Sequence, residues 1–155
     1  MANPADDELA LEFGRVLTEQ ISPDEGPFYD ELITAYRSPI PARRDRTLAF
    51  GVSPDSVLAL ALLEVGKVVL QGIWSVLQPM LSGLVHDSAD ALRAELSEKL
   101  KDWIKSKFKK PIPVTIKPDD VQNILTSVRE AAARQGMNES QIAEVTKTLT
   151  QALAS

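Results

Sequence analysis

The sequence predicts an all-α fold: a single-domain helical bundle of about five to seven helices around a long apolar central helix. Three observations predict it. Apolar residues recur at helical spacing in almost every segment, helix-start signals precede several of these segments, and Ser56–Val85 carries only two charged residues, Glu64 and Lys67. The length of 155 residues fits one domain, 1–155.

The N-terminal region, residues 1–37, is acidic and is expected to form two helices. Pro4 followed by acidic residues marks the first start, because proline suits the first helical turn and acids complement the positive end of the helix dipole. Ser22 is expected to cap the second helix, with Pro23 and Glu25 in its first turn. Gly26 and Pro27 weaken this start, and the alternative is a helix that begins a turn later. The expected inward faces are Leu9, Phe13, Val16 and Leu17, then Phe28, Leu32 and Tyr36.

Residues 38–52 hold two prolines, a glycine and a cluster of arginines, which is typical of a long loop. Ser53-Pro54-Asp55 is then expected to cap the central helix. Together with the basic helix that follows, this central helix makes up the region 53–110.

The polar residues of the central helix fall on one narrow stripe. Their spacings of three and four residues follow the helical repeat, and the register continues past Pro79, which predicts a kinked helix that carries on. The stripe comprises Glu64, Lys67, Gln71, Ser75, Gln78 and Ser82.

A helix that is apolar over most of its surface must be covered on nearly all sides. The middle of a helical bundle provides this, with the polar stripe reaching solvent at one edge, and so does a bilayer, which a run of eighteen uncharged residues (Val68–Val85) can cross. In the soluble fold we expect Leu70, Ile73, Trp74 and Leu77 to be nearly fully buried, because they lie on or beside the face opposite the stripe.

A basic amphipathic helix is expected over Ala89–Lys110. Lysines flank an apolar face that includes Trp103 and Phe108. This pattern is typical of a bundle helix with a solvated lysine face, and also of an interfacial helix on anionic lipid.

The remaining chain is expected to form a linker, residues 111–117, and a helical hairpin, residues 118–155. Pro111–Ile116 should be extended or form a single edge strand. Gly136 suits the end of the first hairpin helix, and Asn138-Glu139-Ser140-Gln141 is a capping box for the second. The inward faces are Val121, Ile124, Leu125 and Val128, then Ile142, Val145, Leu149 and Leu153.

Charge is unevenly distributed along the chain. Residues 1–36 carry a balance of −8, whereas residues 93–110 carry +4. Such asymmetry is expected either of a basic surface for an acidic partner or of an acidic region that packs beside the basic helix in the same molecule.

The chain has no Cys and one His, His86, so the usual zinc sites and a Cys–His pair are excluded. Glycine-rich nucleotide-binding motifs are absent as well. No cofactor, metal, catalytic residue or small-molecule substrate is therefore expected, and the chain is not expected to be an enzyme. The acidic N-terminus does not resemble a secretory signal, which favours a cytoplasmic location, with peripheral or conditional membrane association under the bilayer interpretation.

The function expected from these patterns is a non-enzymatic helical interaction module or adaptor that self-associates or binds a protein partner. The alternative is a conditional, pore-forming type of membrane effector that inserts through Val57–Val85 while its basic helix contacts anionic lipid. Nucleic acid is not an expected partner, because one basic helix in a chain of pI 4.9 is a small electrostatic footprint. The expected partner or membrane contacts are Gln71, Ser75, Gln78, Ser82, Lys99, Trp103, Lys107, Phe108 and Lys110.

Overall fold

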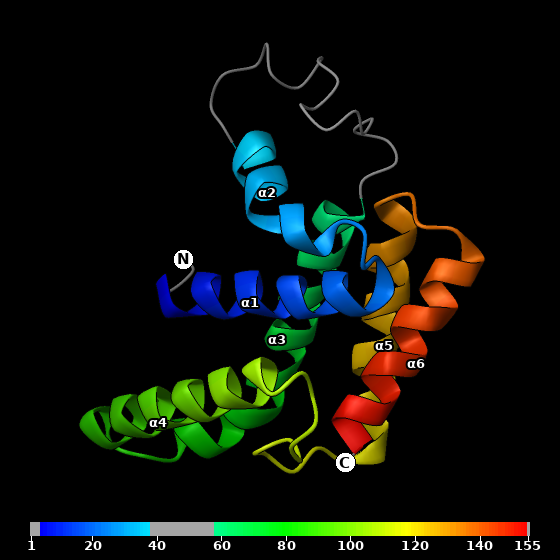
Figure 1. The fold of residues 1–155 in the computed structure, drawn as a ribbon. Coiled ribbons are helices and arrows are strands. Elements are labelled where there is room, and N and C mark those ends of the chain that lie inside the picture. The colour runs from blue at the N-terminus through cyan, green and yellow to red at the C-terminus, as the bar shows by residue number, and fades with distance from the viewer. Residues whose placement is uncertain (1–3, 38–57, 155) are drawn as a thin grey trace.

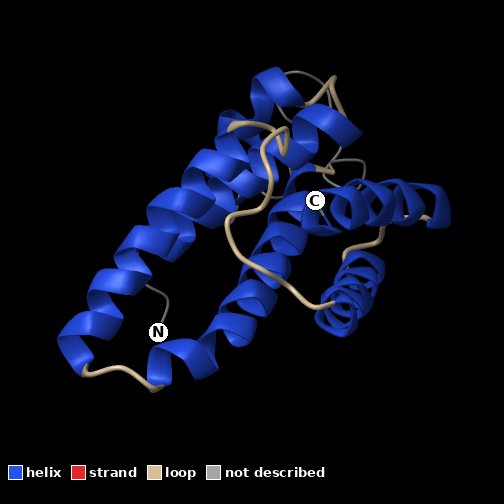
Figure 2. Ribbon diagram, turned by 90° about the horizontal axis from the view of Figure 1, so that it is seen from below, coloured by secondary structure: helices blue, strands red, loops and turns tan. Residues whose placement is uncertain are grey.

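The computed structural model describes residues 4–37 and 58–154, and this part of the chain is all-helical (Figures 1 and 2). The elements are α1 (Pro4–Ile21), the short 3-10 turn η1 (Gly26–Phe28), α2 (Tyr29–Arg37), α3 (Ala59–Ser82), α4 (His86–Lys105), α5 (Pro118–Arg134) and α6 (Glu139–Ala154). The predicted all-α bundle with an apolar central helix is confirmed. The predicted loop 38–52 and the cap at 53–55 lie outside the described residues.

The central helix α3 packs mainly against α1 and α5, with smaller contacts to α2 and α4. Figure 1 shows α1 crossing α3, with α5 and α6 to one side and α4 returning from the far end of α3. Within α3 the buried residues include Leu70, Ile73 and Leu77, as expected. The helix also continues past Pro79 for a further turn, as the polar register predicted.

Glycines allow the neighbouring helices to approach α3 closely. A Cβ added at Gly66 would lie 3.3 Å from Cβ of Phe13 and 3.5 Å from the Ala10 carbonyl oxygen on α1. A Cβ added at Gly72 would lie 2.6 Å from Cγ1 of Ile124 on α5. At 3.6 residues per turn these glycines face about 120° apart, so α1 and α5 cover two different sides of α3.

The N-terminus of α3 is capped by a side chain from a distant part of the sequence. The Glu25 carboxylate accepts hydrogen bonds from the backbone N–H of Leu58 at 2.9 Å and of Ala59 at 3.1 Å. Ser22 donates its hydroxyl hydrogen bond to the same carboxylate at 2.7 Å. The prediction that Ser22 caps the second helix is therefore wrong, whereas the alternative of a later start is confirmed, because α2 begins at Tyr29 after the turn η1. Glu25, held by Ser22, caps α3 instead.

Two predicted faces need correction. Phe28 was expected to point inward, but it lies in η1 and is 39% exposed, and Tyr29 is buried in its place. Trp74 was expected to be nearly fully buried, but it is only partly buried. Its ring packs partly on the core, and the guanidinium of Arg93 lies 4.5 Å from the ring centroid.

The basic helix is shorter at its C-terminal end than predicted, because α4 ends at Lys105. Lys107 and Phe108 adopt left-handed backbone conformations, with φ of 60° and 64°, and these turn the chain away from the helix axis. Phe108 then folds back, and its ring centroid lies 5.3 Å from that of Phe13 and 5.0 Å from that of Trp103. Packing of the partly buried Phe108 ring on two other aromatic rings compensates for the two unfavourable backbone conformations.

The C-terminal hairpin forms as predicted from its end signals. Gly136 has φ of +85°, and Met137 donates its backbone N–H to the Ala132 carbonyl, which closes a Schellman motif at the end of α5. Asn138 and Gln141 exchange hydrogen bonds of 2.9 Å and 2.8 Å, which is the capping box of α6. In the described linker, residues 111–117, the chain forms no strand, and it bends at Pro113 and Val114, where an extended segment or an edge strand was expected.

We predict that Gly14→Ala lowers the free energy of unfolding by about 1–3 kcal/mol, although alanine favours a helix. The new Cβ would lie 2.5 Å from Oη of Tyr29 and 3.0 Å from Cα of Leu63. It would displace the Tyr29 hydroxyl, which donates to the Leu11 carbonyl at 2.9 Å. Chemical denaturation measures the change.

The matched control is Gly83→Ala, whose Cβ would approach nothing closer than 3.8 Å. It should change stability by less than about 0.5 kcal/mol. Equal stability of the two variants would show that α1 and α3 do not cross this closely.

Candidate functional site

The polar stripe of α3 reaches solvent. Gln71, Ser75, Gln78 and Ser82 are exposed, and Glu64 pairs with Lys67 at 3.2 Å near the other end of the helix. Ser82 donates its hydroxyl hydrogen bond to the Pro79 carbonyl at 3.1 Å. The stripe is thus the side of α3 that neither α1 nor α5 covers.

A groove of about 480 Å³ runs between this stripe and α5. Its apolar floor includes Val68, Val76 and Ile124, and Gln71 and Ser75 form the α3 rim. The α5 rim is polar and comprises Asp120, Asn123, Ser127, Glu130 and Arg134.

Exposed large apolar side chains gather at the far end of α3. Val85 is 72% exposed, Met80 51% and Leu84 41%. Among the described residues, Phe28 is the only other large apolar side chain that is exposed. We call Met80, Leu84 and Val85 the apolar tip. Figures 1 and 2 show the turn that carries it at the edge of the molecule, away from α5 and α6. Grouped exposed apolar residues mark contact sites more often than single ones do.

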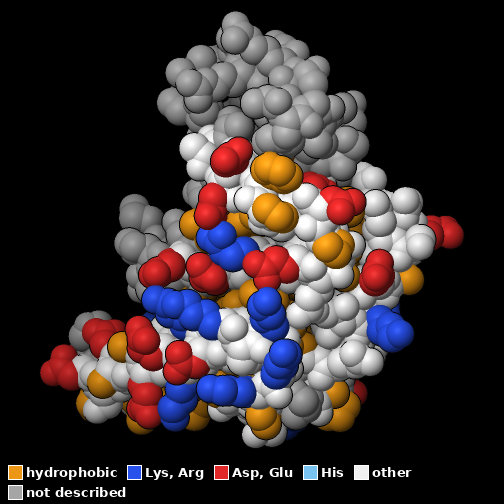
Figure 3. Space-filling view, viewed as in Figure 1, with side chains coloured by type: hydrophobic (Ala, Val, Ile, Leu, Met, Phe, Trp, Pro, Cys, Tyr) orange, Lys and Arg blue, Asp and Glu red, His pale blue; other side chains and the backbone are white. Residues whose placement is uncertain are grey.

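The acidic helix α1 packs beside the basic helix α4, and ion pairs join them. Lys101 contacts Glu8 at 3.2 Å, and Lys107, just beyond α4, contacts Glu19 at 3.5 Å. The hydrogen bond from Lys101 to Glu8 raises the pKa of Lys101. Figure 3 shows basic and acidic side chains side by side on the face where α1 and α4 lie, so part of the lysine charge is neutralised within the molecule.

The other expected contact residues are placed differently. Lys99 pairs with Glu95 on its own helix at 3.2 Å, and Lys110 is exposed in the turn after α4. Trp103 is 1% exposed and Phe108 is partly buried, and both pack on Phe13. The ring of Trp103 belongs to the core here, so a contact role for it would require α4 to leave α1, whereas Phe108 keeps part of its surface exposed.

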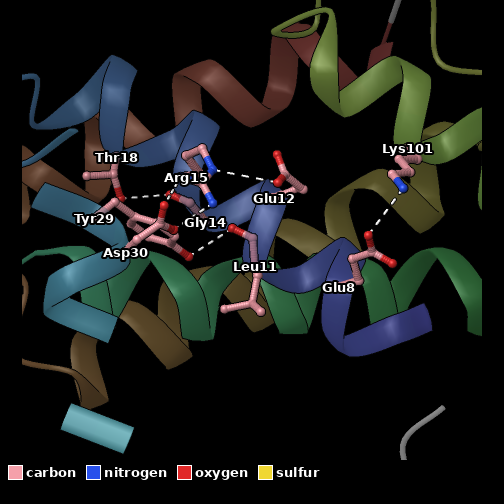
Figure 4. Close-up of polar contacts among 9 residues, drawn as sticks. All are labelled: Glu8, Leu11, Glu12, Gly14, Arg15, Thr18, Tyr29, Asp30 and Lys101. Atoms are coloured by element: carbon pink, nitrogen blue, oxygen red, sulfur yellow. Dashed lines mark hydrogen bonds and ion pairs between the residues drawn. The ribbon is translucent and has the colours of Figure 1, made fainter. Parts of the chain in front are cut away.

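A second polar cluster fastens α2 to α1 (Figure 4). Arg15 donates two hydrogen bonds to the Asp30 carboxylate, at 2.6 Å and 3.0 Å, and its guanidinium lies 5.2 Å from the centroid of the Tyr29 ring. These hydrogen bonds lower the pKa of Asp30 and raise the pKa of Arg15. These contacts serve the fold, because the charged groups of Arg15 and Asp30 are paired with each other within the molecule.

Among the described residues, no group of three or more His, Cys, Asp or Glu side chains is arranged to hold a metal ion. One described helix, α3, is long and apolar enough to cross a bilayer, and half of its most apolar window is buried. Comparisons of the chain with protein-family models, with curated proteins and with solved structures find no match.

We predict that Ser75→Arg leaves the free energy of unfolding within about 0.5 kcal/mol of the wild type, because Ser75 lies on the exposed stripe. Leu77→Ala, two positions along the same helix, should lower it by about 2–5 kcal/mol, because Leu77 is 4% exposed. Urea titration followed by circular dichroism compares the two. A destabilised Ser75→Arg would place the stripe against another part of the protein.

Proposed function

We propose that the chain is a non-enzymatic helical interaction module that self-associates, with the apolar tip as part of its contact surface. The observation that carries the proposal is the grouping of Met80, Leu84 and Val85 at one end of the α3–α4 pair. Large apolar side chains exposed together are unfavourable in water, and covering them on association stabilises the complex.

The chemistry around the apolar tip favours a protein contact over an anionic lipid surface. Asp87 and Asp90, both exposed, follow it at the start of α4, whereas the lysines of α4 lie in its second half. Carboxylates beside the tip would be repelled by anionic headgroups. A protein surface that combines apolar and basic groups is complementary to them.

We predict that the wild-type chain self-associates in a concentration-dependent way and that the double variant Leu84→Glu, Val85→Glu weakens this association at least tenfold, since charges would replace apolar contacts. Sedimentation velocity over a range of protein concentrations measures the change. Ala133→Glu, on the exposed side of α5 away from the tip, is the control and should behave as the wild type. A wild-type chain that stays monomeric throughout would refute self-association.

The second candidate, a conditional membrane effector, rests on the length and mean hydropathy of α3, which are sufficient for a bilayer span. We predict for this case that the wild type releases dye from anionic vesicles and that Ser75→Arg, although folded, does not. An arginine near the middle of the inserting run costs about 2.5–3.5 kcal/mol.

Ser140→Arg, exposed on α6, is the matched control and should retain the leakage. An inert wild type would exclude the membrane candidate, and an active Ser75→Arg would exclude insertion through α3.

A further inference from the structure

The outer face of α4 is a helix surface without a covering element among the described residues. The helix buries Leu96, Leu100, Trp103 and Ile104, and it packs on α1 and, more weakly, on α3. Figures 1 and 2 show it along one edge of the molecule. The opposite side carries a stripe with spacings of three, four and seven residues, all of them exposed: Asp87, Ala91, Ala94, Glu98 and Lys105.

Charge along α4 changes sign near its middle. The acids Asp87, Asp90, Glu95 and Glu98 come first, and Lys99, Lys101 and Lys105 follow. Two residues depart from this order. Arg93 is turned onto the ring of Trp74, and Asp102 lies one residue beyond Lys101. The helix is therefore acidic in its N-terminal half and basic in its C-terminal half.

We propose that this face binds a second copy of the chain, with the two α4 helices antiparallel about a twofold axis. Such an isologous contact needs a self-complementary surface, and a helix whose halves carry opposite charge is self-complementary when paired antiparallel. The register that sets Asp87 opposite Lys105 of the second copy forms this pair twice. It also brings Glu95 near Lys99 of the second copy.

The same register has its midpoint at residue 96, so Ala94 lies near the centre of the contact, opposite Glu98 of the second copy. Ala91 and Ala94 lie on either side of Leu92 and Arg93, which face the molecule's own core and Trp74. Small residues let two helices approach closely, at the shorter end of the usual 8–10 Å interaxial range. Ala91 lies opposite Lys101 and Ala94 opposite Glu98 of the second copy, so the alanines contact the methylene groups of these side chains, which adds to the charge pairing at the two ends.

The apolar tip falls at the ends of this pairing. Leu84 and Val85 precede α4, and the turn with Phe108 follows it, so antiparallel helices bring the tip of one copy toward that turn of the other. Phe108 is only partly buried by its own chain and offers apolar surface. The tip, the alanines and the charge order thus all lie along a single contact.

Other occupants match the face less well. An anionic lipid surface would be attracted to the lysines and repelled by the acidic half, and an acidic or basic protein helix would match only one half. A second copy matches both halves at once.

This inference rests on the proposed self-association and is tested by charge reversal in the full chain. Asp87→Lys sets two lysines against each other at both ends of the contact, and Lys105→Asp sets two aspartates against each other there. Each variant alone should therefore dimerise about tenfold more weakly than the wild type. In an equimolar mixture of the two variants a heterodimer can form. At one end the introduced lysine at position 87 meets the introduced aspartate at position 105, and at the other end the unchanged Lys105 meets the unchanged Asp87. Opposite charges therefore meet at both ends. Sedimentation equilibrium of the mixture should then recover the wild-type Kd to within about threefold, and added salt should weaken the wild-type dimer.

Matched controls reverse a charge elsewhere. Asp119→Lys is also an exposed first-turn aspartate, on α5, and Lys147→Asp is exposed on α6. Both should leave the Kd of the dimer unchanged, alone and mixed. Because the chain lacks cysteine, Ala94→Cys also provides a single thiol near the twofold axis, and a short bismaleimide should cross-link it far faster than Ser140→Cys on α6.

The outcomes separate this pairing from self-association in general. A wild type that remains monomeric refutes both. A wild-type dimer that is weakened by Leu84→Glu, Val85→Glu, but not by either charge reversal, refutes the α4 pairing alone. Weakening by both reversals without recovery on mixing refutes the antiparallel register.

Discussion

The crossing of α1 over α3 is the contact on which the rest of the structure depends. Gly14 and Gly66 bring the two backbones so close that Cα of Leu63 lies 3.0 Å from where a Cβ of Gly14 would be. At this separation Phe13 is fully buried and reaches the rings of Trp103 and Phe108, which attach α4 to α1. Tyr29, buried beside Gly14, ties the start of α2 to α1 through its hydroxyl. A wider crossing would loosen α4 and the start of α2 together, because side chains and carbonyls of α1 contact both.

Local signals predicted the ends of the C-terminal hairpin helices, whereas contacts between residues far apart in the sequence could not be predicted and overrode the helix-start signal at Ser22. The capping box at Asn138 and the glycine at 136 depend on residues within four positions of one another, so the pattern contains the whole interaction. The cap of α3 joins Glu25 to Ala59, 34 positions away, and no spacing rule reveals such a partner. The end of α4 also depends on a long-range contact, because the left-handed backbone at Phe108 is stabilised by the ring of Phe13 on another helix.

The candidate contact surface was predictable in one part only. The polar stripe through Gln71 and Ser75 was expected at solvent, since polar side chains at helical spacing mark the uncovered side of a helix. The apolar tip was not expected, because Leu84 and Val85 continue an apolar run, and such a run is typical of a buried segment. Periodicity shows which residues could be covered, whereas the lengths and positions of the neighbouring helices decide which are. Figure 1 shows α4 beside the far end of α3, and the contact between the two helices is small.

The two candidate functions differ in how much of the folded structure must rearrange before they can act. Insertion of α3 into a bilayer would remove Val69 and Ile73, both fully buried, from contact with α1 and α5, so the molecule would lose its core before gaining lipid contacts. Each large apolar side chain contributes about 1.5–3 kcal/mol when buried, and the separated faces of α1 and α5 would then need new cover. The apolar tip and the outer face of α4 are exposed in the folded state and need no rearrangement to meet a partner. Since a ligand shifts a conformational equilibrium only by its differential affinity for the two states, a membrane would have to supply the whole free energy of opening, whereas a second copy would not.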